Sequence, residues 1–275
     1  MCEKIDGGRY GGEMRLKFID VHAHLYLMQG KEEEDEWRLK YSERYGIEKL
    51  IISVLGSWGK RSPLYFPDPV DFRSGNKRLH EFIRSYQGPL ELYGYVTVNQ
   101  AFLEDSLDEL RRGVEKYGFV GLKLLAPFPC NDSSTFKLIE KAVDYDIPIL
   151  IHTFHGRKSG ITGQNPSDST DVAFLSKNFP RAKIIMAHIG GGGDWEYALK
   201  AVRGTKVYVD ISGSGCDKGM IEKAVRIVGV DRVLFGTDLN MGVGIAKLLD
   251  SNLTHEEKLK IAWNNAMAVF GGALK

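Results

Sequence analysis

Short apolar runs alternate with longer segments of helical periodicity along most of this chain. In one such segment Leu103, Leu107, Leu110 and Val114 fall on one face of a helix. The apolar runs predict eight strands, at Leu16–Val21, Leu50–Leu55, Leu90–Val98, Phe119–Leu125, Ile147–Ile151, Lys183–Ala187, Lys206–Ile211 and Arg232–Phe235. The periodic segments predict helices at Lys31–Tyr45, Lys77–Tyr86, Leu103–Tyr117, Ser133–Tyr145, Ser169–Asn178, Trp195–Val202, Lys218–Val228, Ile245–Leu249, His255–Ile261 and Asn265–Phe270.

Strands that alternate with helices indicate a parallel sheet with right-handed crossovers. Several of the strands are apolar throughout, as expected when both faces of a sheet are covered. Eight strands favour a closed barrel over an open sheet, and such barrels need about 250 residues. The 275 residues of this chain therefore predict a single-domain α/β fold, a (β/α)₈ TIM barrel.

Two segments stand outside this alternation. Residues 1–15 are rich in glycine and lack the apolar stretch of a secretory signal, so we expect a flexible N-terminal extension before a barrel of residues 16–275. The segment from Ser57 to Gly75 holds three prolines and several aromatic residues. It predicts a long loop, of the kind that forms a lid or binds a ligand.

Composition narrows the function classes. The 37 basic and 36 acidic residues give a net charge of +1, whereas nucleic-acid-binding proteins usually carry an excess of basic residues. No run approaches the about 18 apolar residues that a membrane span needs. Three widely spread cysteines form no disulfide framework, which favours the cytoplasm. The expected partner is a small-molecule substrate, and the oligomeric state stays open, a homo-oligomer included.

Polar side chains gather where the predicted strands end. His22 and His24 follow the first strand, and residues two apart in a strand point to the same face. Later strands offer single candidates at or just after their ends: Lys123, His152, His188 and Asp238. Active sites of TIM barrels lie at this carboxyl end of the strands. Imidazole and carboxylate groups converging there suit zinc, and also manganese or iron.

The segments that carry these residues read DVHAH, GLKLL, IHT, AHIGG, FGTDLN and WNNAMAVFG. Their order and residues resemble those of the amidohydrolase superfamily. The resemblance is to its amidohydrolase-related branch in particular, which contains metal-dependent hydrolases and aminocarboxymuconate semialdehyde decarboxylase-like enzymes. The resemblance spans Phe18 to Gly272. It implies one divalent metal ion held by the histidine pair, the fifth-strand histidine and the eighth-strand aspartate, which here are His22, His24, His152 and Asp238. It also implies that His188 contacts the metal-bound water or the substrate.

These roles predict a metal-dependent hydrolase with zinc as the expected metal and manganese or iron as alternatives. A bound divalent ion lowers the pKa of its water from about 15.7 to about 7. His188 and Asp238 are then the catalytic residues, since one can take a proton from the water and the other can pass it to a leaving group. The substrate is expected to be small and to bear a carboxylate or a carbonyl group.

Lys123 decides the expected number of metals. Members of the superfamily with two metals bridge them by a carbamylated lysine on the fourth strand, whereas an unmodified lysine fits the branch with one metal. We expect one metal, with Lys123 binding a substrate carboxylate or carbonyl. His155 and Arg157 follow His152 and are further candidates for binding an anionic substrate group.

Three other functions remain open from the sequence. The first is a non-oxidative decarboxylase of the same branch, because its ligands are the same. The second is a TatD-like nuclease, which shares the histidine pair but usually has a fourth-strand glutamate where this chain has Lys123. The third is a non-catalytic metal-binding or scaffold protein, which would have no need of His188 beside the four ligands.

Overall fold

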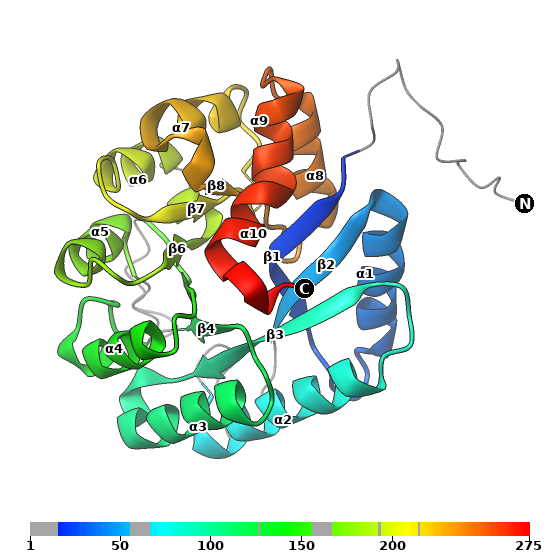
Figure 1. The fold of residues 1–275 in the computed structure, drawn as a ribbon, viewed down its shortest axis with the longest axis vertical. Coiled ribbons are helices and arrows are strands. Elements are labelled where there is room, and N and C mark those ends of the chain that lie inside the picture. Colours follow the sequence, from blue (N-terminus) through cyan, green and yellow to red (C-terminus); the bar gives the residue numbers. More distant parts are fainter. Residues whose placement is uncertain (1–15, 56–66, 126, 156–166, 192–193, 214) are drawn as a thin grey trace, which may run out of the picture.

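A computed structural model describes residues 16–55, 67–125, 127–155, 167–191, 194–213 and 215–275. Eight parallel strands run in chain order around one sheet (Figure 1). Their bounds are β1 (Phe18–Leu25), β2 (Ile47–Val54), β3 (Glu91–Val98), β4 (Gly121–Leu124), β5 (Ile149–Ile151), β6 (Ile184–Met186), β7 (Tyr208–Asp210) and β8 (Val233–Leu234). The predicted fold class, a single-domain (β/α)₈ TIM barrel, is confirmed.

The first and last strands meet to close the barrel almost completely. The backbone N–H of Val21 donates to the carbonyl of Phe235 across 3.1 Å, and the N–H of Asp238 donates to the carbonyl of His22 across 2.7 Å. A single parallel bridge pairs Ala23 with Asp238. The segment after β8 is therefore tied directly to the part of β1 that carries the two histidines.

Helices surround this sheet. Their bounds are α1 (Glu32–Tyr45), α2 (Pro69–Ser85), α3 (Leu103–Glu115), α4 (Phe136–Asp144), α5 (Ser169–Asn178), α6 (Trp195–Ala201), α7 (Met220–Val228), α8 (Met241–Asp250), α9 (His255–Leu259) and α10 (Asn265–Phe270). Figure 1 shows α10 lying across the end of the barrel that faces the viewer. Its Val269 and Phe270 join the interior cluster that includes Ile19 and Tyr95. This helix covers the end where the strands begin, and the strand ends with the candidate site lie on the opposite side.

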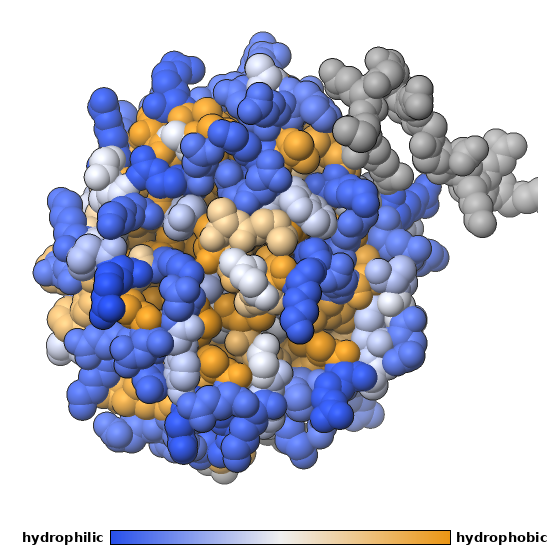
Figure 2. Space-filling view, viewed as in Figure 1, coloured by the Kyte–Doolittle hydropathy of each residue, from blue (hydrophilic) through white to orange (hydrophobic). Residues whose placement is uncertain are grey.

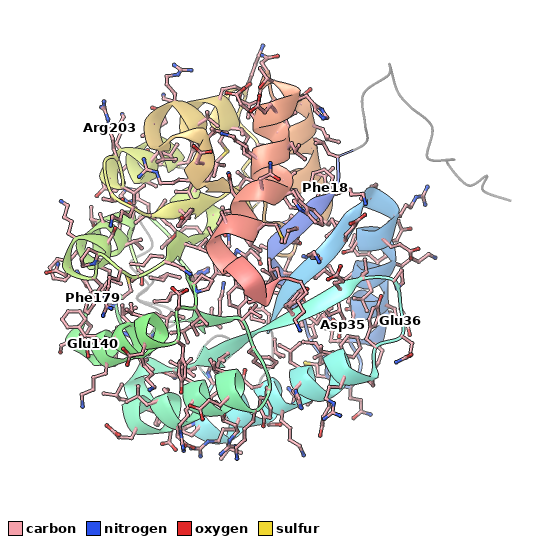
Figure 3. All side chains as sticks on the ribbon, viewed as in Figure 1. Phe18, Asp35, Glu36, Glu140, Phe179 and Arg203 are labelled. Atoms are coloured by element: carbon pink, nitrogen blue, oxygen red, sulfur yellow. The ribbon has the colours of Figure 1, made fainter. Side chains whose placement is uncertain are left out.

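The core has two parts because strand side chains alternate between the two faces of the sheet. Ile19, Ile51 and Tyr95 point into the barrel, and the Tyr95 hydroxyl donates to the carbonyl of Val21 across 2.7 Å. A larger apolar cluster fills the space between the strands and the helices. On the face shown in Figure 2, hydrophilic side chains cover much of the surface and apolar residues are visible between them. Glu36 and Glu140 illustrate the outward-pointing charged residues (Figure 3).

Two of the boundaries that differ from the sequence prediction change how the chain is interpreted. Strand β1 runs to Leu25 rather than ending at Val21, so both histidines lie within the strand. Helix α2 starts at Pro69, inside the segment expected to be a loop. The Asp68 carboxylate accepts hydrogen bonds from the N–H groups of Val70 and Asp71, and proline suits the first helical position.

The remaining loop and the N-terminal extension cannot be compared with their predictions. Residues 57–66 of the expected loop and residues 1–15 lie outside the described residues. Among the described helices, none has the length and apolar character needed to cross a membrane.

Candidate metal centre

His22 lies at the middle of the site, fully buried on β1. Its Nδ1 lies 2.9 Å from Oδ2 of Asp210 at the end of β7. Its Nε2 lies 2.8 Å from Nζ of Lys123 on β4. A carboxylate beside Nδ1 keeps the ring proton on that atom, so the lone pair of Nε2 points toward the interior, which is the arrangement that metal-binding histidines show.

His24 is held in the same way by a different neighbour. Its Nδ1 lies 3.1 Å from the carbonyl oxygen of Ser53 on β2, which can only accept a hydrogen bond. Its Nε2 lies 3.2 Å from Oδ1 of Asp238. With the proton on Nδ1, both of these facing atoms are acceptors, and a divalent cation bound between them would satisfy both. The donor set therefore fits a metal ion.

A hydrogen bond from Arg38 holds the main chain of Asp238. Asp238 has a φ of 53°, a left-handed conformation that is uncommon outside glycine. The guanidinium of Arg38, on α1, donates to its carbonyl oxygen across 2.5 Å. The same guanidinium donates to the Asp20 carboxylate across 2.9 Å, and Asp20 also accepts from the backbone N–H groups of His22 and Thr237. One buried ion pair thus braces the backbone of both His22 and Asp238.

His188 bridges the remaining candidates. It also has a left-handed backbone, with a φ of 63°, and its N–H donates to Oδ1 of Asp210. Its Nδ1 lies 3.0 Å from the Ser212 hydroxyl and 3.5 Å from Oδ2 of Asp238. Its Nε2 lies 3.1 Å from Nδ1 of His152. His188 therefore stands between the eighth-strand carboxylate and the fifth-strand histidine.

The structure brings most of the predicted site residues together. Potential ligand atoms of His22, His24 and Asp238 lie within 4.8 Å of one another. His152 is outside this group and reaches the cluster through His188. A second group of the same kind consists of His22, His188 and Asp210.

The candidate substrate-binding residues are placed less uniformly. Lys123 is buried within the site, against His22. His155 instead pairs with Asp168, the residue that caps α5, across 2.7 Å, and its ring lies against Tyr197. Arg157 lies outside the described residues.

Burial keeps the imidazoles of the site neutral. It lowers the pKa of His22 to about 3, an effect reinforced by the nearby Lys123 cation and opposed by Asp210. Burial likewise lowers the pKa of His24, His152 and His188. Neutral imidazole is the form that binds a metal, so no proton has to leave the histidines first.

The other charged groups divide into carboxylates and one lysine. Burial alone would raise the pKa of Asp238 and of Asp210, but the neighbouring histidines, and their hydrogen bonds, hold both well below the usual range. Both are therefore anionic at neutral pH. Burial lowers the pKa of Lys123 to about 8, although Asp238 and Asp210 oppose the change. Near neutral pH this amine is a cation that loses its proton readily.

Several residues of the site gave little signal in the sequence. Asp210 and Ser212 end the seventh strand, and that position was the only hint that they belong with His22 and His188. Asp20 precedes the histidine pair on β1. Arg38 lies on a highly charged helix and reads as a surface residue, yet its side chain is 6% exposed.

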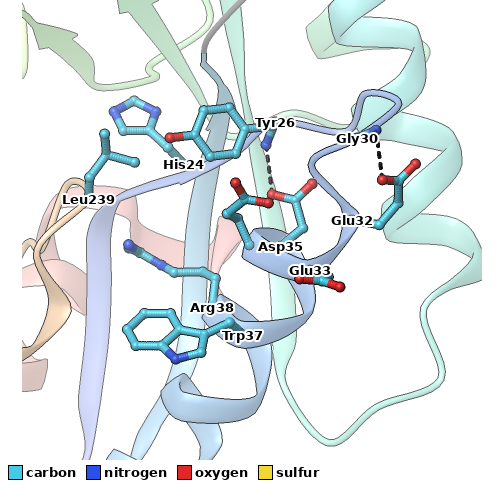
Figure 4. A pocket seen from close by; sticks show the side chains of 10 residues that line it. His24, Tyr26, Gly30, Glu32, Glu33, Asp35, Trp37, Arg38 and Leu239 are labelled. Atoms are coloured by element: carbon cyan, nitrogen blue, oxygen red, sulfur yellow. Dashed lines mark hydrogen bonds between the residues drawn. The ribbon is translucent and has the colours of Figure 1, made fainter.

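A cavity of about 690 Å³ opens beside the site (Figure 4). Its lining comes from the end of β1, the turn that follows it, the first half of α1 and the residue after Asp238. The lining residues are His24, Tyr26, Gly30, Glu32, Glu33, Glu34, Asp35, Trp37, Arg38 and Leu239. Because His24 forms part of the wall, a molecule in the cavity would lie next to the candidate metal ligands.

Solved structures with this architecture come from several bacteria. A 2,6-dihydroxybenzoate decarboxylase from Rhizobium is 18% identical, with 93% of this chain and 98% of that chain covered and a TM-score of 0.70. A dihydroxybenzoic acid decarboxylase from Polaromonas sp. JS666, with bound manganese, is 17% identical, with 93% and 97% covered and a TM-score of 0.69. A 5-carboxyvanillate decarboxylase from Novosphingobium aromaticivorans DSM 12444, also with manganese, is 16% identical, with 94% and 97% covered and a TM-score of 0.68.

At these identities the likeness shows the fold alone. A search of curated proteins finds no match. The model of the amidohydrolase family matches residues 19–272, nearly the whole barrel. The chain therefore belongs to the amidohydrolase family.

Proposed function

We propose that this protein is a metal-dependent, non-oxidative decarboxylase of small carboxylic acids. The observation that carries the proposal is that a lysine amine lies beside side chains suited to bind a metal. Nζ of Lys123 lies 2.8 Å from Nε2 of His22, which belongs to the same cluster as Asp238. A carboxylate substrate needs positive charge on one side and a proton donor on the other. The solved structures of decarboxylases with the same barrel support this choice.

The metal ion would be held by His22, His24 and Asp238, with His152 as the proposed fourth ligand. Zinc is the first choice for this nitrogen and oxygen donor set, and manganese, which two of the similar structures contain, is the alternative. When bound, the ion supplies positive charge that stabilises an anionic substrate oxygen. One ion per chain is proposed, because an unmodified Lys123 cannot bridge two metals as a carbamylated lysine does.

The residues of this chain then have separate tasks. Lys123 holds the substrate carboxylate or a neighbouring oxygen. When the carbon–carbon bond breaks, carbon dioxide leaves and the electron pair remains on the substrate carbon, which must take one proton. His188 takes a proton from the solvent and delivers it to this carbon, and Asp238, 3.5 Å from its Nδ1, stabilises the imidazole while it is protonated.

Hydrolysis is the second candidate, and the contact between Asp238 and both His24 and His188 favours it. A carboxylate in this position could carry a proton from water to a leaving group. The same four ligands serve either reaction, so the products must decide between them.

The test incubates zinc- or manganese-loaded protein with 2,6-dihydroxybenzoate and related hydroxybenzoates, and in parallel with aryl esters and lactones. The proposal expects release of carbon dioxide and, in deuterated water, one deuterium on the vacated carbon. His188→Asn should abolish this release, whereas His80→Asn, on α2, should not. Ester or lactone hydrolysis without any decarboxylation would overturn the proposal in favour of the hydrolase.

A further inference from the structure

The cavity beside the metal centre has two unlike ends. At one end His24, Tyr26 and Leu239 lie close together, and at the other lies Glu32 (Figure 4). Tyr26, Trp37 and Leu239 supply apolar surface, and Trp37 and Leu239 are about half exposed. A volume of about 690 Å³ is in the usual range for small-molecule sites. The cavity can therefore accept a group as large as an aromatic ring.

Hydrogen bonds from backbone N–H groups to carboxylates shape the rim of this cavity. The two oxygens of Asp35 accept from the backbone N–H groups of Tyr26 and Leu27, each across 2.8 Å. Glu32 accepts from the N–H of Gly30, also across 2.8 Å. The turn between β1 and α1 is thereby fixed in place, so the cavity is formed before any ligand arrives.

The charge on this wall is negative. Glu34 pairs with Lys31, while the carboxylate of Glu33 makes no hydrogen bond or ion pair with another described residue. Arg38 brings a positive charge to the cavity, but the carboxylate of Asp20 neutralises it. Carboxylates therefore outnumber the cations around the cavity, and Lys123 is not among the residues that line it.

We propose that the cavity binds the uncharged or cationic, ring-sized end of a monocarboxylate substrate and excludes a second anionic group. The proposal rests on the proposed function, because the substrate carboxylate must lie at Lys123 and the metal. A group extending from there past His24 meets Tyr26, Trp37 and the carboxylates of α1. A second carboxylate would be repelled there, and a ring, a hydroxyl or an amine would not.

Three probes of one shape test this directly: benzoate, 4-(aminomethyl)benzoate and terephthalate. Their dissociation constants are measured by titration calorimetry on protein whose metal content has been determined. We expect benzoate and 4-(aminomethyl)benzoate to bind about tenfold more tightly than terephthalate at low salt. The difference should shrink as salt is added, because exposed charges are screened.

Two substitutions on α1 locate the effect. Glu33→Gln should improve terephthalate binding about threefold to fivefold and leave benzoate binding unchanged. Glu36→Gln is the matched control, since Glu36 is an exposed carboxylate of the same helix that does not line the cavity. Trp37→Ala should weaken benzoate about fivefold, and Tyr45→Ala, an exposed aromatic at the other end of the helix, should not.

The outcomes separate this proposal from the proposed function. Metal-loaded, active protein that binds terephthalate as tightly as benzoate overturns the cavity proposal alone. An equal effect of Glu33→Gln and Glu36→Gln also overturns it, as does a failure of the loaded protein to bind any of the three probes. Protein that takes up no metal and releases no carbon dioxide overturns the proposed function instead.

Discussion

The guanidinium of Arg38 donates to the main-chain carbonyl of Asp238 across 2.5 Å, joining the first helix to the segment after the last strand. Its second amino group pairs with Asp20, whose carboxylate also accepts from the N–H of His22. The orientation of His22 and Asp238, two proposed metal ligands, therefore depends on Arg38, a residue of α1 that is not itself a proposed ligand.

Arg38→Met should destabilise the protein by about 3–5 kcal/mol, because it leaves the buried Asp20 carboxylate without its partner. It should also weaken zinc binding, which is measured by competition with a chelating dye. Lys40→Met, an exposed change on the same helix, is the control. If the Met variant does not fold, Thr237→Val, which removes one hydroxyl from the same network, gives a milder version. Unchanged zinc affinity in a folded variant would contradict the positioning role.

Asp210→Asn should lower zinc affinity about tenfold to a hundredfold. Both oxygens of Asp210 accept hydrogen bonds, one from His22 and the other from the N–H groups of His188 and Ser212. An amide would place an N–H group against one of these donors. Asp144→Asn, an exposed change near the end of α4, should have no effect, and equal zinc affinities in the two variants would show that Asp210 does not orient the site.

Metal analysis should find one zinc or manganese ion per chain in protein loaded and then desalted. Removing it with a chelator should lower the melting temperature, and a metal concentration of about 100 times the dissociation constant should restore about 2.7 kcal/mol. Two ions per chain would instead indicate a carbamylated Lys123 and a second site at His188 and Asp210.

Lys247 gives the stability of the metal-free protein a predictable pH dependence. Its amine donates to the carbonyls of Ser212 and Gly213, and burial lowers its pKa from 10.5 to about 8. Between these values the unfolded chain holds a proton that the folded chain has lost, so the free energy of unfolding rises with pH. Lys247→Met should remove an increase on the order of 1–3 kcal/mol from this window.

The measurement is denaturant unfolding at pH 7.5 and at pH 10, with Lys40→Met as the control. The wild-type protein and the control should gain more stability than Lys247→Met between the two pH values. Parallel pH profiles for all three proteins would mean that Lys247 is not the titrating group.

The sequence predicted the barrel well because each element carries its own local pattern. Helix α5 lies at the predicted residues, Ser169–Asn178, and each predicted strand overlaps an observed one. The gathering of the strand-end residues was also predictable, since a parallel barrel places all strand ends on one side. The pairing of Arg38 with Asp20 and Asp238 could not be predicted, because it joins residues far apart in the chain. A charged helix gives no sign that one of its arginines is buried.

The beginning of α2 shows a different limit. Three prolines and several aromatic residues indicate a loop when they are read together, yet Asp68 and Pro69 are favourable residues for starting a helix. The cavity likewise could not be predicted from the sequence. Its walls come from the segments after the first and the last strand, and the charged run of α1 reads as an ordinary solvated surface.

The bridge between Ala23 and Asp238 gives the proposed metal a second physical role. An ion held by His24 and Asp238 would be a cross-link between the two ends of the barrel, enclosing nearly all of its residues in one loop. Cross-links stabilise a fold by restricting the unfolded chain, and the restriction grows slowly with the length of the loop. The proposed ion would then hold the two ends of the barrel together. Its loss would weaken the contact between the first and last strands before the rest of the sheet.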